Sequence, residues 1–432
     1  MNRKSKKLTI NVGLMAAGNM ASKMLSFILI PFYTYVLSTY EYGIIDIITT
    51  TSMLLLPMFS LQINEAVMRF CLDRGADTKK IFNIGIVIFL IGFAILFCFS
   101  PLIMKIETLN NYYLLFLVYY FTSGIYTLFS QYTKGIEKIK IFTVAGVLNT
   151  IIVIICNLYF LLYKKYGING YILSYIVGNT LSTIFIMVFS GAIKNFDTFT
   201  IDRVLAKSMV KYSAPMIPNS ISWWITNSSD KYMVTYFLGV AANGIYSVSY
   251  KIPSLLSTVN SIFMSAWYIS AVEDFGTDES KKFFGNTYRS LTVLNLLIVS
   301  LVILMARPIA HLLYSKDFFV AWKYSVVLVL GFMFNSLSSF LGSVYTTSKK
   351  TAPLFYTSLS GAVFNIILNA ILIPKIGIQG AAVATTGSYI FVWLIRVIHT
   401  KRIFRFDICL RLNVISGLIL LLQIIFVNFN LW

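Results

Sequence analysis

Thirteen long apolar segments dominate this sequence, and each is long enough to cross about 30 Å of hydrocarbon as a helix. Of all residues, 58% are hydrophobic and only 12% are charged, whereas soluble proteins carry about 25% charged residues. We therefore predict an all-α integral membrane protein. The segments fall near residues 9–37, 43–68, 81–104, 111–133, 141–163, 169–190, 212–238, 242–271, 285–313, 320–346, 352–373, 377–398 and 413–431.

The basic residues are distributed unevenly over the connections between these segments. With the N-terminus placed inside, 25 of the 35 Lys and Arg residues lie at inner ends, Arg396 among them, 7 lie at outer ends and 3 lie within helices. Because Lys and Arg accumulate on the cytoplasmic side of membrane proteins, this bias predicts a cytoplasmic N-terminus. Topology also explains most of the net charge of +19, so we expect no nucleic-acid partner.

The residue types that carry enzymatic or redox chemistry are sparse. Only His311 and His399 could join the cysteines as metal ligands, and the short connections hold no cluster of carboxylates or histidines. We therefore predict neither a disulfide framework, nor a transition-metal centre, nor an enzyme. The cysteines show no Cys-x-x-Cys spacing and stand at Cys71, Cys98, Cys156 and Cys409.

Two internal matches indicate a repeat. Tyr35–Ile45 resembles Tyr236–Tyr246 at an offset of 201 positions, and Lys165–Gly170 resembles Lys375–Gly380 at an offset of 210 positions. Each half holds six segments, so both copies keep one orientation and form parallel repeats, as in transporters with a site between two lobes. The predicted domains are an N-terminal lobe over 1–193, a C-terminal lobe over 194–400 and one additional helix within 401–432.

Three motifs resemble one known family. Asn369–Thr385, Lys211–Pro215 and Ser229–Lys231 are similar to the Wzx-type flippases, the polysaccharide exporters of the multidrug/oligosaccharidyl-lipid/polysaccharide (MOP) superfamily. The resemblance covers residues 1 to 400, and its most specific part is the first motif. It implies two six-helix lobes arranged as in multidrug and toxic compound extruders.

The resemblance also implies a cargo and a location. Such a protein carries undecaprenyl-pyrophosphate-linked repeat units of O-antigen, capsule or exopolysaccharide across the bacterial cytoplasmic membrane. We expect a monomer without a cofactor, surrounded by membrane lipids, coupled to a sodium or proton gradient and working with a polysaccharide polymerase.

Three lysines lie inside the predicted helices, where a charge needs a polar partner or a wet cavity. Lys23 follows Asn19 in the first segment, and Lys231 and Lys251 lie about ten residues on either side of one turn, hence about 15 Å below it. Lysine is a common phosphate ligand, so we expect these residues to meet a pyrophosphate. The alternative for the second pair is an ion pair with Asp230.

Three further charged residues are candidates for gates. Glu65 and Arg69 stand one helical turn apart beyond Pro57, which predicts either a local ion pair or part of an inner gate. Asp46, near the outer end of the same segment, is a candidate for an outer gate.

A set of oxygen-bearing residues resembles the sodium site of the related lipid II flippases. Asn365 and Asn369 share one helix face, as do Ala381 and Thr385, and Asn227 or Asp230 would supply the remaining ligand. Asn369 stands where the family has a carboxylate. Simple packing of amides between helices is the alternative.

Two other transporters fit the same fold. A multidrug extruder should present acids to cationic drugs, whereas the charges within these helices are mainly basic. A lipid II flippase typically has two helices beyond the twelve, and this sequence offers one, Asn413–Leu431.

Overall fold

A computed structural model describes residues 18, 20, 22–73, 75–99, 101, 105, 107–192, 202–273, 278–348 and 352–428. Every regular element in these ranges is helical. The first part of the chain contains α2 (Ile30–Val36), α3 (Thr39–Phe59), α4 (Ile63–Cys71), α5 (Thr78–Cys98), α7 (Glu107–Asn110), α8 (Tyr113–Gly135), α9 (Ile139–Asn157), the π-helix η1 (Leu158–Tyr163), α10 (Gly167–Ser190) and α11 (Arg203–Ser213). The rest contains η3 (Ala214–Met216), α12 (Ile217–Leu238), α13 (Val240–Ser249), α14 (Lys251–Glu273), α15 (Asp278–Leu304), α16 (Ala306–Leu313), η4 (Lys316–Val320), α17 (Ala321–Thr347), α18 (Ala352–Ile376), α19 (Ile378–Ile403) and α20 (Leu410–Asn428).

The chain divides into two compact units. Unit 1 comprises Met1–Leu37 and Ile44–Trp224, and unit 2 comprises Ser38–Gly43 and Ile225–Trp432. This division follows contacts rather than the sequence repeat, so the lobe boundary predicted at residue 193 stays a prediction.

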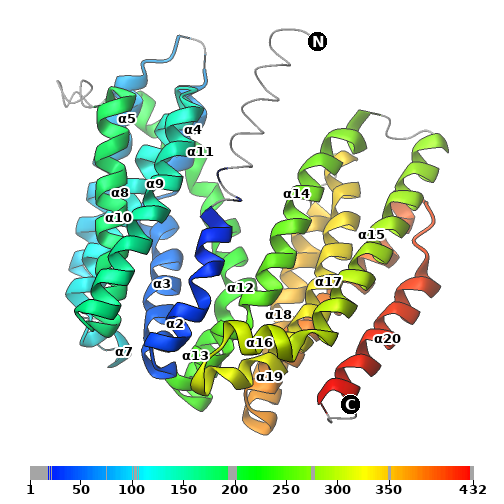
Figure 1. Ribbon diagram of the computed structural model, residues 1–432. Coiled ribbons are helices and arrows are strands. Elements are labelled where there is room, and N and C mark those ends of the chain that lie inside the picture. The colour runs from blue at the N-terminus through cyan, green and yellow to red at the C-terminus, as the bar shows by residue number, and fades with distance from the viewer. Residues whose placement is uncertain are drawn as a thin grey trace. The chain divides into compact units, whose positions relative to one another are not determined.

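Unit 1 is a bundle in which α8 and α10 are central. α10 packs along α9 and α8, while α8 also contacts α4 and α5 (Figure 1). Glycines allow the close approaches: a Cβ at Gly92 of α5 would overlap the carbonyl oxygen of Phe59, and one at Gly178 of α10 would lie 2.5 Å from Val153. By contrast, only 11% of the residues in the most apolar stretch of the α9–η1 span are buried. Such exposure is typical of a lipid-facing helix.

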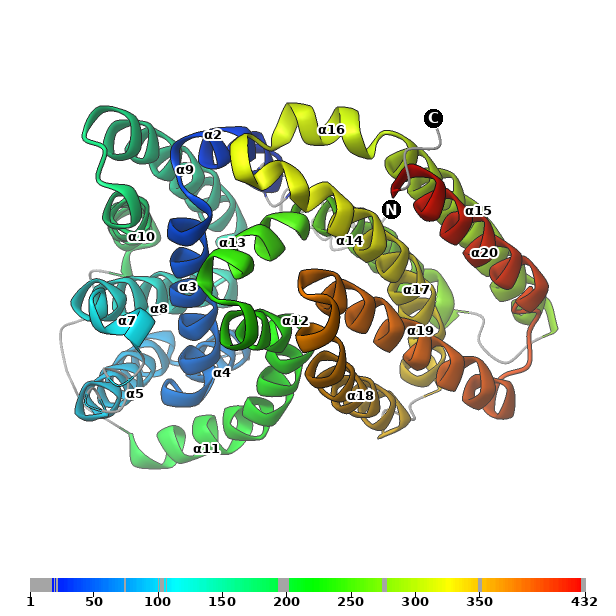
Figure 2. The ribbon, with the colours of Figure 1, turned by 90° about the horizontal axis from the view of Figure 1, so that it is seen from below.

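Unit 2 is organised around α17. This helix contacts α14, α15, α18, α19 and α20, and 83% of the most apolar part of the η4–α17 span is buried (Figure 2). Its interior face includes Phe340, which packs against Trp267 with ring centroids 4.5 Å apart. α15 and α20 run alongside each other.

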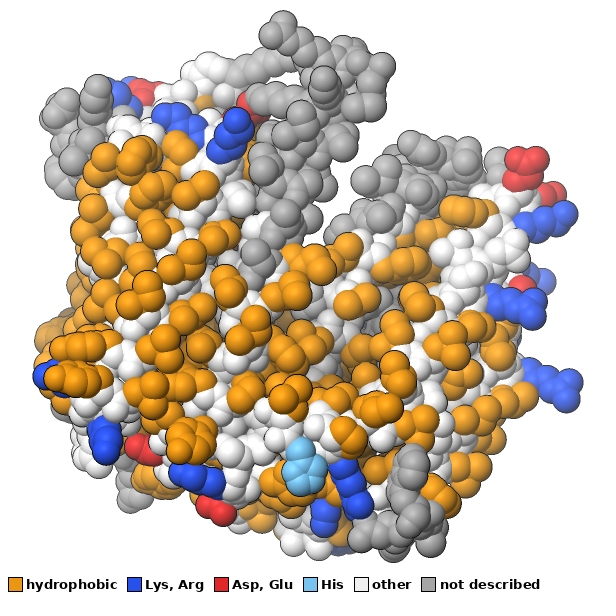
Figure 3. Space-filling model, in the orientation of Figure 1, with side chains coloured by type: hydrophobic (Ala, Val, Ile, Leu, Met, Phe, Trp, Pro, Cys, Tyr) orange, Lys and Arg blue, Asp and Glu red, His pale blue; other side chains and the backbone are white. Residues whose placement is uncertain are grey.

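Ten helices in the described ranges are long and apolar enough to cross a membrane. On the face shown in Figure 3, apolar side chains cover the middle of each unit and Lys and Arg gather near the ends of the helices. Three predicted spans are not among the ten. The first is described only in part, at residues 18, 20 and 22–37. The seventh corresponds to α12, which is rich in Ser and Asn, and the eighth is divided into α13 and α14.

Helix breaks occur where the sequence places proline. α3 ends two residues after Pro57, and Leu61 and Gln62 adopt left-handed conformations (φ +52° and +53°) before α4 begins. Pro215 lies in η3 and Pro218 in the first turn of α12, where a missing N–H costs no helical hydrogen bond. Both prolines therefore mark the start of a helix.

The second sequence repeat has the same local structure in both copies. Gly167 and Gly377 have positive φ values of 53° and 62°, and each stands at the start of a helix. Gly170 and Gly380 then allow their helices to pack closely on the preceding one. The glycines of this motif are therefore required by backbone geometry.

The first sequence repeat forms a reciprocal contact inside unit 2. A Cβ at Gly43 would overlap the carbonyl oxygen of Val240, and a Cβ at Gly244 would overlap the carbonyl oxygen of Thr39. Val240 lies 201 positions after Thr39, as Gly244 does after Gly43. The start of α3 thus crosses the start of α13 with backbone against backbone.

The N-terminus of α5 gives a pH-dependent prediction. Asp77 Oδ1 accepts the N–H of Lys80 at 3.2 Å, and this bond holds the pKa of Asp77 below its usual value. A lowered folded-state pKa stabilises the helix start above the unfolded pKa, and this stability is lost as pH falls through the folded pKa. We expect first-turn amides of α5 to lose hydrogen-exchange protection in acid. Asp77→Ala, which removes a cap worth about 1 kcal/mol, should show the same loss at neutral pH. Equal protection in both proteins at both pH values would contradict this.

Candidate functional site

Unit 2 contains a buried polar cluster centred on Asp230 of α12. The side chain of Asp230 is 2% exposed, and its Oδ2 accepts hydrogen bonds from Tyr246 at 2.6 Å, Tyr250 at 2.5 Å and Thr385 at 3.2 Å. Its Oδ1 accepts the backbone N–H of Lys231 at 3.0 Å. A carboxylate taken out of water needs such partners, and here they come from three helices, α12, α13 and α19.

The two tyrosines were not predicted as site residues. Tyr246 lies in α13, and Tyr250 directly follows the last residue of that helix. The two are four residues apart and lie on one face, with their hydroxyls 3.1 Å from each other. The i,i+4 spacing beside Lys251 was the available signal. The sequence offered Asn227 or Asp230 as the remaining ligand of the cation site, and the structure places Asn227 half-buried on α12, one turn before Asp230.

The asparagines of α18 extend the cluster. Asn369 Nδ2 donates to Asn365 Oδ1 at 2.9 Å, and Asn365 Nδ2 lies 3.4 Å from Thr385 Oγ1. Asn369 is fully buried, and its Oδ1 accepts no hydrogen bond from any residue that the structure describes. Ala381, fully buried, lies one turn before Thr385 on α19. The structure thus brings together Asp230, Asn365, Asn369 and Thr385.

The donor set suits a small hard cation. All candidate ligands carry oxygen, one of them is a carboxylate, and the Oδ1 atom of Asn369 is a buried acceptor with a vacant lone pair. Sodium and similar ions prefer oxygen ligands of this kind. The residues therefore fit a monovalent cation, although two tyrosine hydroxyls already donate to Asp230.

Lys231 and Lys251 are both half-buried in unit 2. Lys251 lies at the start of α14, with its Nζ 5.9 Å from the ring centroid of Tyr42. In the described part of the chain no carboxylate forms an ion pair with Lys251. The oxygens of Asp230, the acid considered as its partner, meet tyrosine and threonine hydroxyls and a backbone N–H instead.

Lys23 lies in a helical stretch of unit 1, residues 22–28, and its side chain is exposed. The neighbouring Ser22 Oγ is 3.5 Å from the carbonyl oxygen of Gly146, which places this stretch beside α9. Asn19, the other predicted contact, lies outside the described residues.

The candidate gate residues have other partners than expected. Arg69 pairs with the exposed Asp73 at 2.5 Å, and Glu65 Oε1 accepts from Gln131 Nε2 of α8 at 2.6 Å. The simple ion pair between Glu65 and Arg69 is therefore absent among the described residues, because each has a nearer partner. Asp46 is half-buried on α3.

Arg396 requires a correction. The sequence placed it among the charges of an inner connection, but it lies within α19 and is 7% exposed. Its guanidinium donates to Ser338 O at 2.9 Å, Thr357 Oγ1 at 3.1 Å and Ser358 Oγ at 2.9 Å. Arginine's fork of donors suits this set, and it joins α17, α18 and α19.

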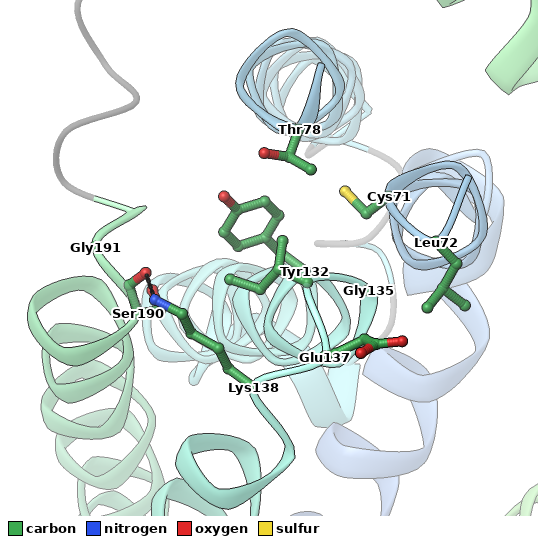
Figure 4. A pocket seen from close by; sticks show the side chains of 10 residues that line it. Cys71, Leu72, Thr78, Tyr132, Gly135, Glu137, Lys138, Ser190 and Gly191 are labelled. Carbon is green, nitrogen blue, oxygen red and sulfur yellow. Dashed lines mark hydrogen bonds between the residues drawn. The ribbon is translucent and has the colours of Figure 1, made fainter. Parts of the chain in front are cut away.

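Unit 1 holds a polar cavity of about 470 Å³ at the ends of α8 and α10 (Figure 4). Lys138 reaches across it and donates to Ser190 O at 2.7 Å, so its charge meets the C-terminus of α10. Cys71 also lines the cavity, and burial raises the pKa of its thiol to about 12. Neither group is available here as a reactive site.

Comparison with curated proteins gives three relatives. MJ1068 of Methanocaldococcus jannaschii, described as an uncharacterized membrane protein, is 26% identical over 300 residues, 65% of this chain and 57% of that protein. A probable low-salt glycan biosynthesis flippase, Agl15 of Haloferax volcanii, is 21% identical over 187 residues, 43% of this chain and 40% of that protein. The chain thus spans about half the length of these two. MJ1375 of Methanocaldococcus jannaschii, also described as an uncharacterized membrane protein, is 26% identical over 89% of this chain and 96% of that protein.

Solved structures show the fold. The lipid II flippase MurJ in an inward closed conformation has a TM-score of 0.69 at 17% identity over 97% of both chains. An inward-facing multidrug resistance MATE family transporter of the MOP superfamily has a TM-score of 0.70 at 12% identity, over 88% of this chain and 95% of that chain. The predicted fold class, an all-α integral membrane fold like that of multidrug and toxic compound extruders, is confirmed.

The sequence also matches a family directly. Residues 8–268, more than half of the chain, match the polysaccharide biosynthesis proteins. The predicted resemblance is therefore confirmed. The chain belongs to the polysaccharide biosynthesis protein family and is a multi-pass membrane protein that shares the fold of the MurJ and MATE structures.

Proposed function

We propose that this protein moves undecaprenyl-pyrophosphate-linked oligosaccharide repeat units from the inner to the outer leaflet of the cytoplasmic membrane, with its N-terminus in the cytoplasm. Family membership and the glycan flippase among its relatives support a lipid-linked glycan as cargo. The protein acts by transport rather than by catalysis.

The proposal that the cargo is anionic rests mainly on Lys251. It is half-buried at the start of α14, and no ion pair joins it to a carboxylate in the described ranges. It directly follows Tyr250, which donates a hydrogen bond to Asp230. A strongly hydrated charge in a membrane protein normally meets substrate, ion or water. A diphosphate would satisfy it through charge-assisted hydrogen bonds. Lys231 and Lys23 are the further proposed contacts, with Asn19 and Asp230 beside them.

The test is transport in proteoliposomes loaded with a fluorescent undecaprenyl-pyrophosphate glycan. Lys251→Met keeps the length of the side chain but removes its charge. It should slow translocation about 10- to 100-fold, the value of a charge-assisted hydrogen bond. Lys251→Arg should retain part of the rate. The matched control is Lys375→Met, since Lys375 is an exposed lysine of the same unit.

The same preparation separates the alternatives. Normal rates for Lys251→Met would remove the headgroup role. Transport of a cationic dye without transport of the glycan lipid would favour a multidrug extruder, and preference for lipid II would favour a lipid II flippase. A polyprenyl monophosphate glycan carried equally well would show that the second phosphate is not recognised.

We further propose that the cluster around Asp230 couples transport to a sodium or proton gradient. Asp230, Asn365, Asn369 and Thr385 would hold the ion, with Asn227 and Ala381 next to them, and the ion would supply a positive charge inside unit 2. The buried acceptor on Asn369 supports this assignment. The inside-negative membrane potential would assist export of an anion by about 2.3 kcal/mol per charge per 100 mV, so coupling is an addition to that drive.

Gates at Glu65, Arg69 and Asp46, a monomeric state and a polymerase partner also remain proposals.

A further inference from the structure

Unit 2 contains a second, strongly basic cavity that the transport proposal does not use. It has a volume of about 510 Å³ and lies at the end of the unit where α15 begins and α19 ends. Four basic side chains and one acidic side chain line it, and they come from two segments more than 100 residues apart. These are Lys281, Lys282, Arg289, Arg405 and Asp407.

The extended segment between α19 and α20 forms one wall. In residues 404–409 the side chains alternate: Phe404, Phe406 and Ile408 are buried, whereas Arg405 and Asp407 are exposed. Phe284 of α15 holds the apolar side, with ring centroids 5.1 Å from Phe404 and 5.7 Å from Phe406. The alternation fixes Arg405 and Asp407 on the face that borders the cavity.

α15 forms the opposite wall. Phe284 and Tyr288 are buried, so Lys281, Lys282 and Arg289 are left on the exposed side of the helix. Gly285 lies between them, and a Cβ there would be in van der Waals contact with Asp407, 3.4 Å from its carbonyl oxygen. The two walls are therefore held close together by a packed aromatic layer.

The charges in the cavity are poorly balanced. Lys281 pairs with Asp278 at 2.7 Å, but the Asp278 side chain is 91% exposed, and such surface pairs are weak. In the described part of the chain, Lys282, Arg289 and Arg405 have no ion-pair partner. Asp407 Oδ1 accepts a hydrogen bond from the backbone N–H of Cys409 at 2.8 Å, so this carboxylate stabilises the turn before α20. The cavity thus offers a net positive field to an anion.

The topology rule alone does not explain this arrangement. It requires Lys and Arg at an inner end, and Lys401 and Arg402 meet that requirement as exposed residues outside the cavity. In unit 1 the cavity lysine, Lys138, is engaged by a helix end. The unit 2 cavity differs from it, because several of its basic side chains have no ion-pair partner among the described residues.

Apolar side chains beside the cavity indicate the source of the anion. Phe283 on α15 and Leu410 and Val414 on α20 are 46%, 43% and 48% exposed, and α15 packs along α20. Figure 3 shows charged side chains above an apolar surface at this end of the unit. We propose that the cavity binds the phosphate headgroup of an anionic membrane lipid, whose acyl chains lie along α15 and α20. Basic pockets at the ends of membrane helices bind such headgroups.

The experiment measures lipid binding to the purified full chain by intact-complex mass spectrometry, with phosphatidylglycerol and, for comparison, phosphatidylcholine of the same acyl chains. Arg289→Gln with Arg405→Gln should weaken phosphatidylglycerol binding about thirtyfold, since each basic residue near a membrane contributes about fivefold. Lys401→Gln with Arg402→Gln removes the same charge nearby and should change binding less than about twofold. Phosphatidylcholine should bind weakly to all variants.

Asp407→Asn provides the opposite test. It keeps an oxygen for the Cys409 N–H but removes the negative charge, so phosphatidylglycerol should bind severalfold more tightly. An equal loss in both double variants, or no change in Asp407→Asn and the Arg289–Arg405 pair, would overturn the proposal.

Inorganic phosphate is the second probe. If it binds with this dependence on the variants and phosphatidylglycerol does not, the lipid assignment is wrong. These readouts require no transport, so they succeed or fail independently of the proposed cargo.

Discussion

Gly244→Ala should prevent stable folding, although it adds a single methyl group. The new Cβ would overlap the carbonyl oxygen of Thr39, a backbone atom that no side-chain rotation can move away. Overpacking of this kind costs about 3 kcal/mol or more. We expect little monodisperse protein after detergent extraction and a much lower unfolding temperature. Gly43→Ala should behave alike, since its Cβ meets the carbonyl oxygen of Val240.

The control for this result is Gly146→Ala. Gly146 also lies inside a membrane helix, but no atom of the described residues lies within 4 Å of a Cβ placed there. The same substitution should therefore leave stability unchanged or raise it by about 0.5–1 kcal/mol, the usual gain from Gly to Ala in a helix. If Gly244→Ala and Gly146→Ala unfold at the same temperature, the backbone crossing is not as close as described.

Asp230→Asn should abolish stimulation of transport by an ion gradient while leaving transport driven by membrane potential. The carboxylate is the only charged ligand of the proposed cation site, and a unit charge 4 Å away contributes about 4 kcal/mol at an effective dielectric constant of about 20. Even allowing for screening, ion-stimulated transport should fall more than about 100-fold. The measurement is glycolipid translocation in proteoliposomes with a sodium gradient at constant pH, then a pH gradient without sodium.

Two variants show whether charge or hydrogen bonding is responsible. Tyr246→Phe and Tyr250→Phe each remove one donor to Asp230 but leave its charge, so each should reduce ion stimulation less than Asp230→Asn. If Asp230→Asn responds to both gradients as the unmodified protein does, the cluster is a structural polar network and the coupling proposal fails.

Much of the fold follows from local patterns in the sequence. The apolar segments and the helix starts at Gly167 and Gly377 depend on composition and backbone preference, which one sequence displays directly. The eighth span was predicted as one segment, because the apolar stretches on either side of Tyr250 are long, but the structure divides it into α13 and α14 beside Ser249, Lys251 and Pro253. α12 is less apolar than the other spans because of its Ser and Asn residues, and of these only Ser228 is buried.

The candidate site was predictable only where spacing carries information. Asn365, Asn369 and Thr385 could be placed by their four-residue intervals and a family resemblance, and the structure does bring them to Asp230. The tyrosines of α13 were missed because aromatic residues are common throughout the chain. Arg396 was assigned to a connection because a charge near a helix end is normally exposed, whereas here Ser338, Thr357 and Ser358 satisfy it inside the unit.

The crossing of α3 and α13 bears on the origin of this chain. Position 39 touches position 244 while position 43 touches position 240, so the two contacts exchange when each residue is replaced by its counterpart 201 positions away. Isologous homodimers have this pattern, in which residue i of one subunit meets residue j of the other and the reverse. Duplication and fusion of a gene for a half-length protein that paired with itself would produce such an exchange of contacts.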